Sequence, residues 1–101
     1  MAIYYFMVEA VPLPGNQEEE ELEGAFINCW VNSTSMKSAL TKATEYIQSE
    51  GWAMQKVEDR FIVHRERYEK DPELLESLEC FDQAVTDGIS SIFYVWTSEE
   101  S

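Results

Sequence analysis

The residues best suited to nucleophilic catalysis or metal binding are one histidine and two cysteines. His64 has only Glu66 nearby in sequence, and no C-x-x-C or H-x-x-x-H spacing places two metal ligands on one element. Cys29 lies in an apolar, strand-like run and Cys80 in a helix-like run. Apolar surroundings raise the pKa of a thiol and suppress its reactivity. We therefore expect reduced structural thiols, no metal site and no Cys–His nucleophile.

The second chemical feature is a glutamate cluster, NQEEEELEG, at residues 16–24. An EF-hand needs alternating Asp and Asn ligands around a central glycine, which successive glutamates do not match. Each of the four glycines stands at the expected end of an element, so no phosphate-binding loop is indicated. The sequence identifies no catalytic residue and no cofactor, and it favours a non-enzymatic function. We expect the cluster to be a solvated connection, with binding of a basic partner as the alternative.

The chain is strongly acidic, with a net charge of −13. All seven Lys and Arg residues lie between Lys37 and Lys70, which leaves two acidic flanks at residues 1–36 and 71–101. Such a field repels phosphate backbones and anionic membranes and attracts basic protein surfaces. We therefore expect no nucleic-acid or membrane partner. The acidity could also serve solubility alone.

No targeting or membrane-spanning segment is indicated. The first residues carry no Lys or Arg before their apolar run, unlike a signal peptide. No apolar run approaches the ~20 residues that span a bilayer. We therefore expect a cytoplasmic protein.

The sequence pattern predicts a single domain at residues 1–97 and a disordered polar tail at residues 98–101. Hydrophobic periodicity predicts its elements in this order: strand 3–11, strand 24–32, a helix within 33–51, an irregular strand 52–64, a helix within 71–88 and strand 89–97. The periodicity of the irregular segment changes phase at residues 55–60. This change predicts a bulge or a turn near Glu58-Asp59, and therefore either one bulged strand or two strands.

Both predicted helices have recognisable ends and apolar stripes. One of Ser33, Thr34 and Ser35 is expected to cap the first helix, and Gly51 to end it. In the second helix, Asp71 is expected to cap and Gly88 to terminate. The first stripe contains Met36, Leu40, Ala43 and Ile47, and the second contains Leu74, Leu78, Phe81 and Val85.

These elements predict an α+β fold. We expect a two-layer sandwich in which a mostly antiparallel sheet of four to five strands carries both helices on one face. The element order is strand, strand, helix, one or two strands, helix, strand, which is ferredoxin-like in general character. This analogy concerns the fold and implies no function.

Strand alternation predicts an aromatic outer face on the side of the sheet away from the helices. Residues such as Ile27, Cys29 and Val31 are expected to face the helices. The opposite parity gives the candidate interaction face, composed of Tyr5, Glu9, Phe26, Asn28, Trp30, Tyr94 and Trp96, with Met7 and Ile92 among them.

Three interpretations of this face are open. The 13–23 loop, the tail or a bulged strand covers it; two copies of the chain pair through it as a homodimer; or it contacts another protein or an apolar small ligand. A nucleic-acid-stacking sheet would need positive charge around its aromatics, which the acidic flanks lack. We therefore expect a small acidic interaction protein, and an inhibitor or immunity protein is a narrower form of this expectation. The alternative is a small-ligand sensor or enzyme accessory domain with a pocket at a homodimer interface.

Overall fold

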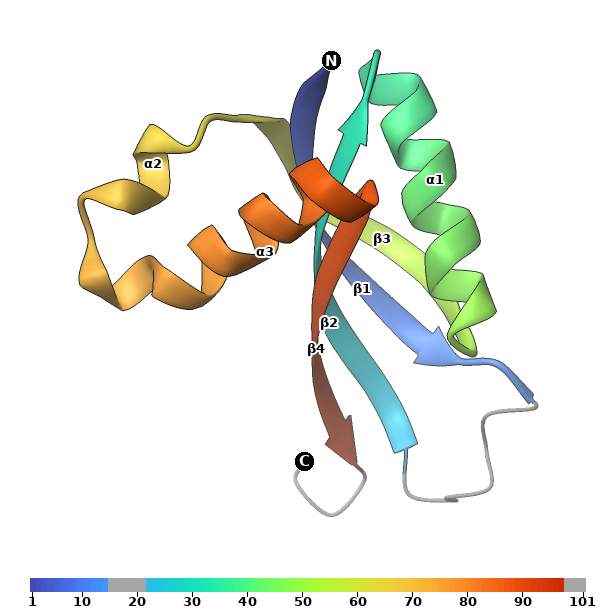
Figure 1. Cartoon of the computed structure of the whole chain (residues 1–101). Coiled ribbons are helices and arrows are strands. Elements are labelled where there is room, and N and C mark those ends of the chain that lie inside the picture. The colour runs from blue at the N-terminus through green and yellow to red at the C-terminus, as the bar shows by residue number, and fades with distance from the viewer. Residues whose placement is uncertain (15–21, 98–101) are drawn as a thin grey trace.

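A computed structural model describes residues 1–14 and 22–97 of the chain. It contains four strands and three α-helices (Figure 1). Their bounds are β1 Ala2–Pro12, β2 Leu22–Ser33, α1 Met36–Ser49, β3 Trp52–Val63, α2 Glu66–Glu69, a 3-10 turn η2 Pro72–Leu74, α3 Leu75–Asp87 and β4 Ile89–Thr97. The predicted tail at 98–101 and most of the glutamate cluster lie outside the described residues.

The four strands form one sheet in the order β3-β1-β2-β4, and every neighbouring pair is antiparallel. The α+β class and the antiparallel sheet are therefore confirmed. The arrangement is not the ferredoxin-like one, in which a helix follows the first strand. Here β2 is the next described strand after β1, and the two pair with each other at the centre of the sheet.

The prediction that both helices lie on one face is wrong. Helix α1 packs on one side of the sheet, and α3 with α2 on the other, as Figure 1 shows. The core is consequently split in two. One half joins α1 to the even-numbered residues of β1, such as Phe6 and Val8. The other joins α3 to the opposite face, which includes Ile3, Trp30 and Val63.

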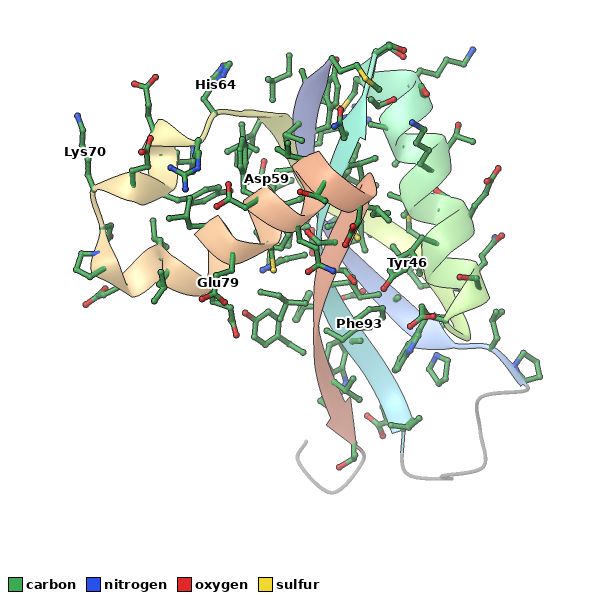
Figure 2. All side chains as sticks on the ribbon, viewed as in Figure 1. Tyr46, Asp59, His64, Lys70, Glu79 and Phe93 are labelled. Atoms are coloured by element: carbon green, nitrogen blue, oxygen red, sulfur yellow. The ribbon has the colours of Figure 1, made fainter. Side chains whose placement is uncertain are left out.

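The first helix forms as its sequence predicts. The Ser35 side chain caps it by accepting a hydrogen bond of 3.0 Å from the backbone N–H of Ser38. Gly51 follows the helix with a φ of 90°, a conformation that a side chain would strain. Ala43 and Ile47 of the predicted stripe are buried against the sheet. On the same side, Tyr46 and Phe93 pack with ring centroids 6.5 Å apart (Figure 2).

The second predicted helix begins with a different geometry. Asp71 caps by accepting from the backbone N–H of Glu73 at 2.9 Å, but the first turn is the 3-10 turn η2. Gly88 ends α3 in the left-handed region, as predicted. Val85 was expected to be buried and is 52% exposed. The helix instead turns Cys80, Phe81 and Ala84 toward the sheet.

The irregular segment is one bulged strand, β3. Its register against β1 shifts between Met7 and Val8 and again between Glu9 and Ala10. Asp59 pairs with Met7 and Val57 with Val8, so Glu58 is the extra residue at the first shift. The predicted bulge near Glu58-Asp59 is confirmed. Within the described residues, no helix is long and apolar enough to cross a membrane.

Candidate aromatic interaction face

The strand register brings the residues of the candidate interaction face onto one side of the sheet. Tyr5 pairs with Trp30, Glu9 with Phe26, and Asn28 stands opposite Met7. On the other side of β2, Phe26 pairs with Tyr94, while Trp96 stands opposite Gly24. Residues directly paired across strands project to the same side. The parity assignment made from the sequence is therefore correct, although α3 covers part of this side.

The half of the face near the end of β2 is buried beneath α2 and α3. Trp30 is only 1% exposed and packs with Phe81 and Ala84. Its indole Nε1 donates a hydrogen bond of 2.9 Å to the hydroxyl of Tyr68. Trp30 was predicted to lie on an outer face, but it is a core residue because α3 crosses this end of the sheet.

Sequence reasoning missed helix α2 and its buried Tyr68. The segment around it, RERYEK, consists of charged residues except for this tyrosine. Arg65 pairs with Glu69 at 3.0 Å, and it also reaches Asp82 on α3 at 2.9 Å. The one available signal was the single aromatic residue among these charges. In a helical turn whose other side chains are charged, the aromatic side chain is the one expected to face the core.

Within residues 1–14 and 22–97, no helix covers the other half of the face. In Figure 1 this is the part of β2 and β4 that lies beyond α3, toward the end of β4. We call it the open half-face and define it by Met7, Glu9, Phe26, Asn28, Tyr94 and Trp96. The rings of Phe26 and Trp96 pack with centroids 5.0 Å apart. Tyr94 is 50% exposed.

Tyr5 lies at the boundary between the covered and open halves. Its ring contacts Trp30 edge-on at 5.3 Å, and its hydroxyl donates to Asn28 Oδ1 at 3.0 Å. Burial is the main cause that raises the pKa of Tyr5 to about 12. The phenol is therefore a neutral hydrogen-bond donor at physiological pH.

The open half-face includes residues of β4, which is an edge strand of the sheet. The sequence of β4, ISSIFYVWT, contains no charged residue and no proline. Its Val95 is 42% exposed on the face opposite Tyr94. An uncharged edge strand offers unpaired backbone groups to another strand. The described residues place no strand beside it.

The opposite edge, β3, differs in composition and shape. It carries Lys56, Glu58, Asp59 and Arg60, and its register shifts twice. Charges and bulges are devices by which natural sheets block strand addition. The two edges therefore differ in properties that control pairing with a further strand: β3 is charged and bulged, whereas β4 carries no charge.

The charges around the open half-face are acidic. Strands β1, β2 and β4 contain Glu9 and Glu23 and no Lys or Arg. Four further glutamates lie in sequence between the end of β1 and the start of β2. Lys56, which pairs with Glu9 in the sheet, is held by Glu58 at 3.2 Å. The charge of these strands is therefore negative at this end of the sheet.

The cysteines lack the properties of a nucleophile. Both are free and buried. Burial raises the pKa of the Cys29 thiol to about 12, and burial followed by the charge of Glu76 raises the pKa of Cys80. A stand-alone enzyme based on a thiolate near neutrality is not supported by either residue. No three His, Cys, Asp or Glu side chains gather as metal ligands within residues 1–14 and 22–97.

Comparison with known proteins gives no relative from which a function could be transferred. The chain matches no protein-family model, no curated protein and no solved structure. Its function must therefore be argued from the sheet, its edge and its charges.

Proposed function

We propose that this protein is a small, non-enzymatic interaction protein. In this proposal a partner protein adds an extended strand to β4 and rests against the open half-face. The observation that carries the proposal is the uncharged edge of β4, beside which the described residues place no strand, together with the half-exposed side chain of Tyr94. Backbone hydrogen bonds from an added strand would supply affinity, and side-chain contacts would supply specificity.

The aromatic side chains supply suitable contact points for such a strand. Tyr94 is half exposed, and Trp96 forms a paired surface with Phe26. Large, rigid aromatic side chains contribute much of the binding energy at protein interfaces. A strand beside β4 would have alternate side chains on this face and could contact Tyr94 directly.

The charge distribution favours a partner with basic residues. Each copy of the chain carries a net charge of −13, so two copies repel each other at long range. A strand flanked by Lys or Arg would instead be attracted to Glu9, Glu23 and the acidic sequence beside them. We therefore assign the edge to a different, basic protein rather than to a second copy.

Two exposed valines provide a matched test. Val95 lies on β4, whereas Val85 lies on α3, and their exposures are 42% and 52%. Val95→Lys places a positive charge on the edge and should block an added basic strand. Val85→Lys makes the same chemical change away from the edge and should leave binding unaltered.

The experiment has two steps. Light scattering over a concentration series should give a monomer for the wild type. A dimer that Val95→Lys dissociates, but Val85→Lys does not, would assign the edge to a second copy instead. Selection from a displayed peptide library should enrich alternating apolar sequences flanked by Lys or Arg. Val95→Lys should weaken their binding at least about tenfold. Peptides that bind Val95→Lys as well as wild type would overturn the proposal.

A further inference from the structure

A second feature lies on the covered half of the same side of the sheet, and it does not depend on the proposed role of β4. A cleft of 230 Å³ opens between the sheet and the segment that contains α2 and η2. Its lining includes Tyr5, Phe61, Tyr68 and Leu74, together with two charged residues, Asp59 and Arg67. Figure 2 shows Asp59 on the α3 side of the sheet.

Arg67 presents its charged guanidinium at this cleft. Its guanidinium lies over the ring of Phe61, 4.6 Å from the centroid. Stacking of this kind holds the planar group while leaving its edge N–H donors free. Among residues 1–14 and 22–97, Arg67 forms no ion pair, unlike Arg65 next to the same helix. A stacked guanidinium with free donors suits a carboxylate, which it can bind through two parallel hydrogen bonds.

Tyr68 and Asp59 add a donor and an acceptor. The Tyr68 oxygen accepts a hydrogen bond from Trp30 Nε1–H, so the O–H of Tyr68, which lines the cleft, can donate to a ligand oxygen. Asp59 Oδ1 accepts from the backbone N–H of Arg60 at 2.9 Å, while the second carboxylate oxygen can accept from an ammonium group. The cleft is thus lined by one cationic and one anionic side chain, together with apolar and aromatic side chains.

We propose that this cleft binds a small zwitterion, an α-amino acid with an apolar side chain of about the size of leucine. Arg67 and the Tyr68 hydroxyl would bind the carboxylate, and Asp59 the ammonium group. Tyr5, Phe61 and Leu74 would contact the side chain. The available volume corresponds to roughly eight water-sized groups at about 30 Å³ each.

The charge balance selects a zwitterion over simpler ions. A simple anion would be repelled by the net charge of −13 and by Asp59. A simple organic cation would meet Arg67 at close range. A zwitterion carries no net charge and pairs with both residues, so neither penalty applies. Loss of either charged group should weaken binding, since hydrogen bonds to charged groups are the stronger ones.

The test uses leucine, methionine and phenylalanine as probes, with NMR chemical-shift titration of the full chain at millimolar concentrations. Leucine should shift signals of residues that line the cleft. N-acetyl-leucine lacks the ammonium charge and leucinamide lacks the carboxylate, so each should bind at least about tenfold more weakly. Arg67→Gln and Asp59→Asn should each weaken leucine binding by a similar factor.

Arg60→Gln is the matched control because Arg60 pairs with Phe6 and so projects to the α1 face of β3. It should leave leucine binding unchanged. The exchanged side chains are exposed, so these variants should fold, and circular dichroism checks this. No shift with any of the three amino acids would overturn the proposal. Equal binding of leucine and N-acetyl-leucine, or unchanged binding to Arg67→Gln, would also overturn it. None of these outcomes bears on whether β4 binds a strand.

Discussion

The indole Nε1 of Trp30 and the hydroxyl of Tyr68 form a hydrogen bond of 2.9 Å between two nearly inaccessible side chains. They lie 38 residues apart in sequence, on β2 and α2. The bond provides the buried indole with its acceptor and connects α2 to β2, one of the two central strands of the sheet. It contributes to holding α2 over the covered half of the aromatic side.

Tyr68→Phe should therefore destabilise the protein by about 1–3 kcal/mol, because it leaves the buried Trp30 N–H without its acceptor. Tyr94→Phe is the control. Because Tyr94 is half exposed, the loss of its hydroxyl leaves no buried polar group without a hydrogen-bond partner. That variant should change the free energy of unfolding by less than about 0.5 kcal/mol. Urea denaturation monitored by circular dichroism measures both. Equal effects of the two substitutions would contradict the structural role of the hydrogen bond.

Local sequence patterns predicted most of the elements and the sides of the strands. Alternation correctly separated Ile27, Cys29 and Val31 from Phe26 and Trp30. The caps at Ser35 and Asp71 were also predictable, because side chains that bond to nearby backbone N–H groups act over a few residues. The bulge in β3 was visible as a change of periodicity.

The placement of the helices was not predictable in the same way. Either side of the sheet offers apolar residues, so periodicity does not specify which face each helix covers. The decisive contacts, such as that between Trp30 and Tyr68, join distant parts of the chain. The candidate interaction face was consequently predicted as one surface, whereas the structure divides it between a core containing Trp30 and the open half-face containing Tyr94.

In the open half-face, the ring of Trp96 packs directly against Gly24. A Cβ atom at position 24 would lie 2.4 Å from the nearest atom of the Trp96 ring, so Gly24→Ala must displace that ring. The loss of packing between Trp96 and Phe26 should cost about 1 kcal/mol. In a Trp96→Ala background the clash is absent. There, Gly24→Ala should be neutral or stabilising by up to about 1 kcal/mol, since it restricts the unfolded chain.

Gly88→Ala separates this steric effect from backbone strain. Gly88 has a φ of +95° and no atom within 4 Å of an added Cβ, so its substitution is strained without any clash. Gly88→Ala should destabilise the protein equally in the wild-type and Trp96→Ala backgrounds. Thermal denaturation of Gly24→Ala and Gly88→Ala, each in the wild-type and the Trp96→Ala background, measures how far the cost of each substitution depends on Trp96. An identical cost of Gly24→Ala in both backgrounds would show that Trp96 does not exclude a side chain at position 24.

The buried thiol and phenol predict a loss of stability at alkaline pH. Burial raises the pKa of Cys29 from its ordinary value of 9.0 to about 12, and that of Tyr5 from 10.0 to about 12. Above pH 9.0 the unfolded chain releases these protons while the folded chain retains them. The folded state then binds more protons, so the free energy of unfolding falls as pH rises. The contribution is fully present below pH 9.0 and is lost as pH rises toward about 12.

Urea denaturation at a series of pH values from neutrality upward measures this slope. Cys29→Ala should reduce the part of the slope that begins near pH 9.0, the ordinary pKa of the thiol. Tyr5→Phe should reduce the part that begins near pH 10.0, the ordinary pKa of the phenol. A Cys29→Ala variant with the wild-type slope above pH 9.0 would show that this thiol titrates alike in the folded and unfolded chain.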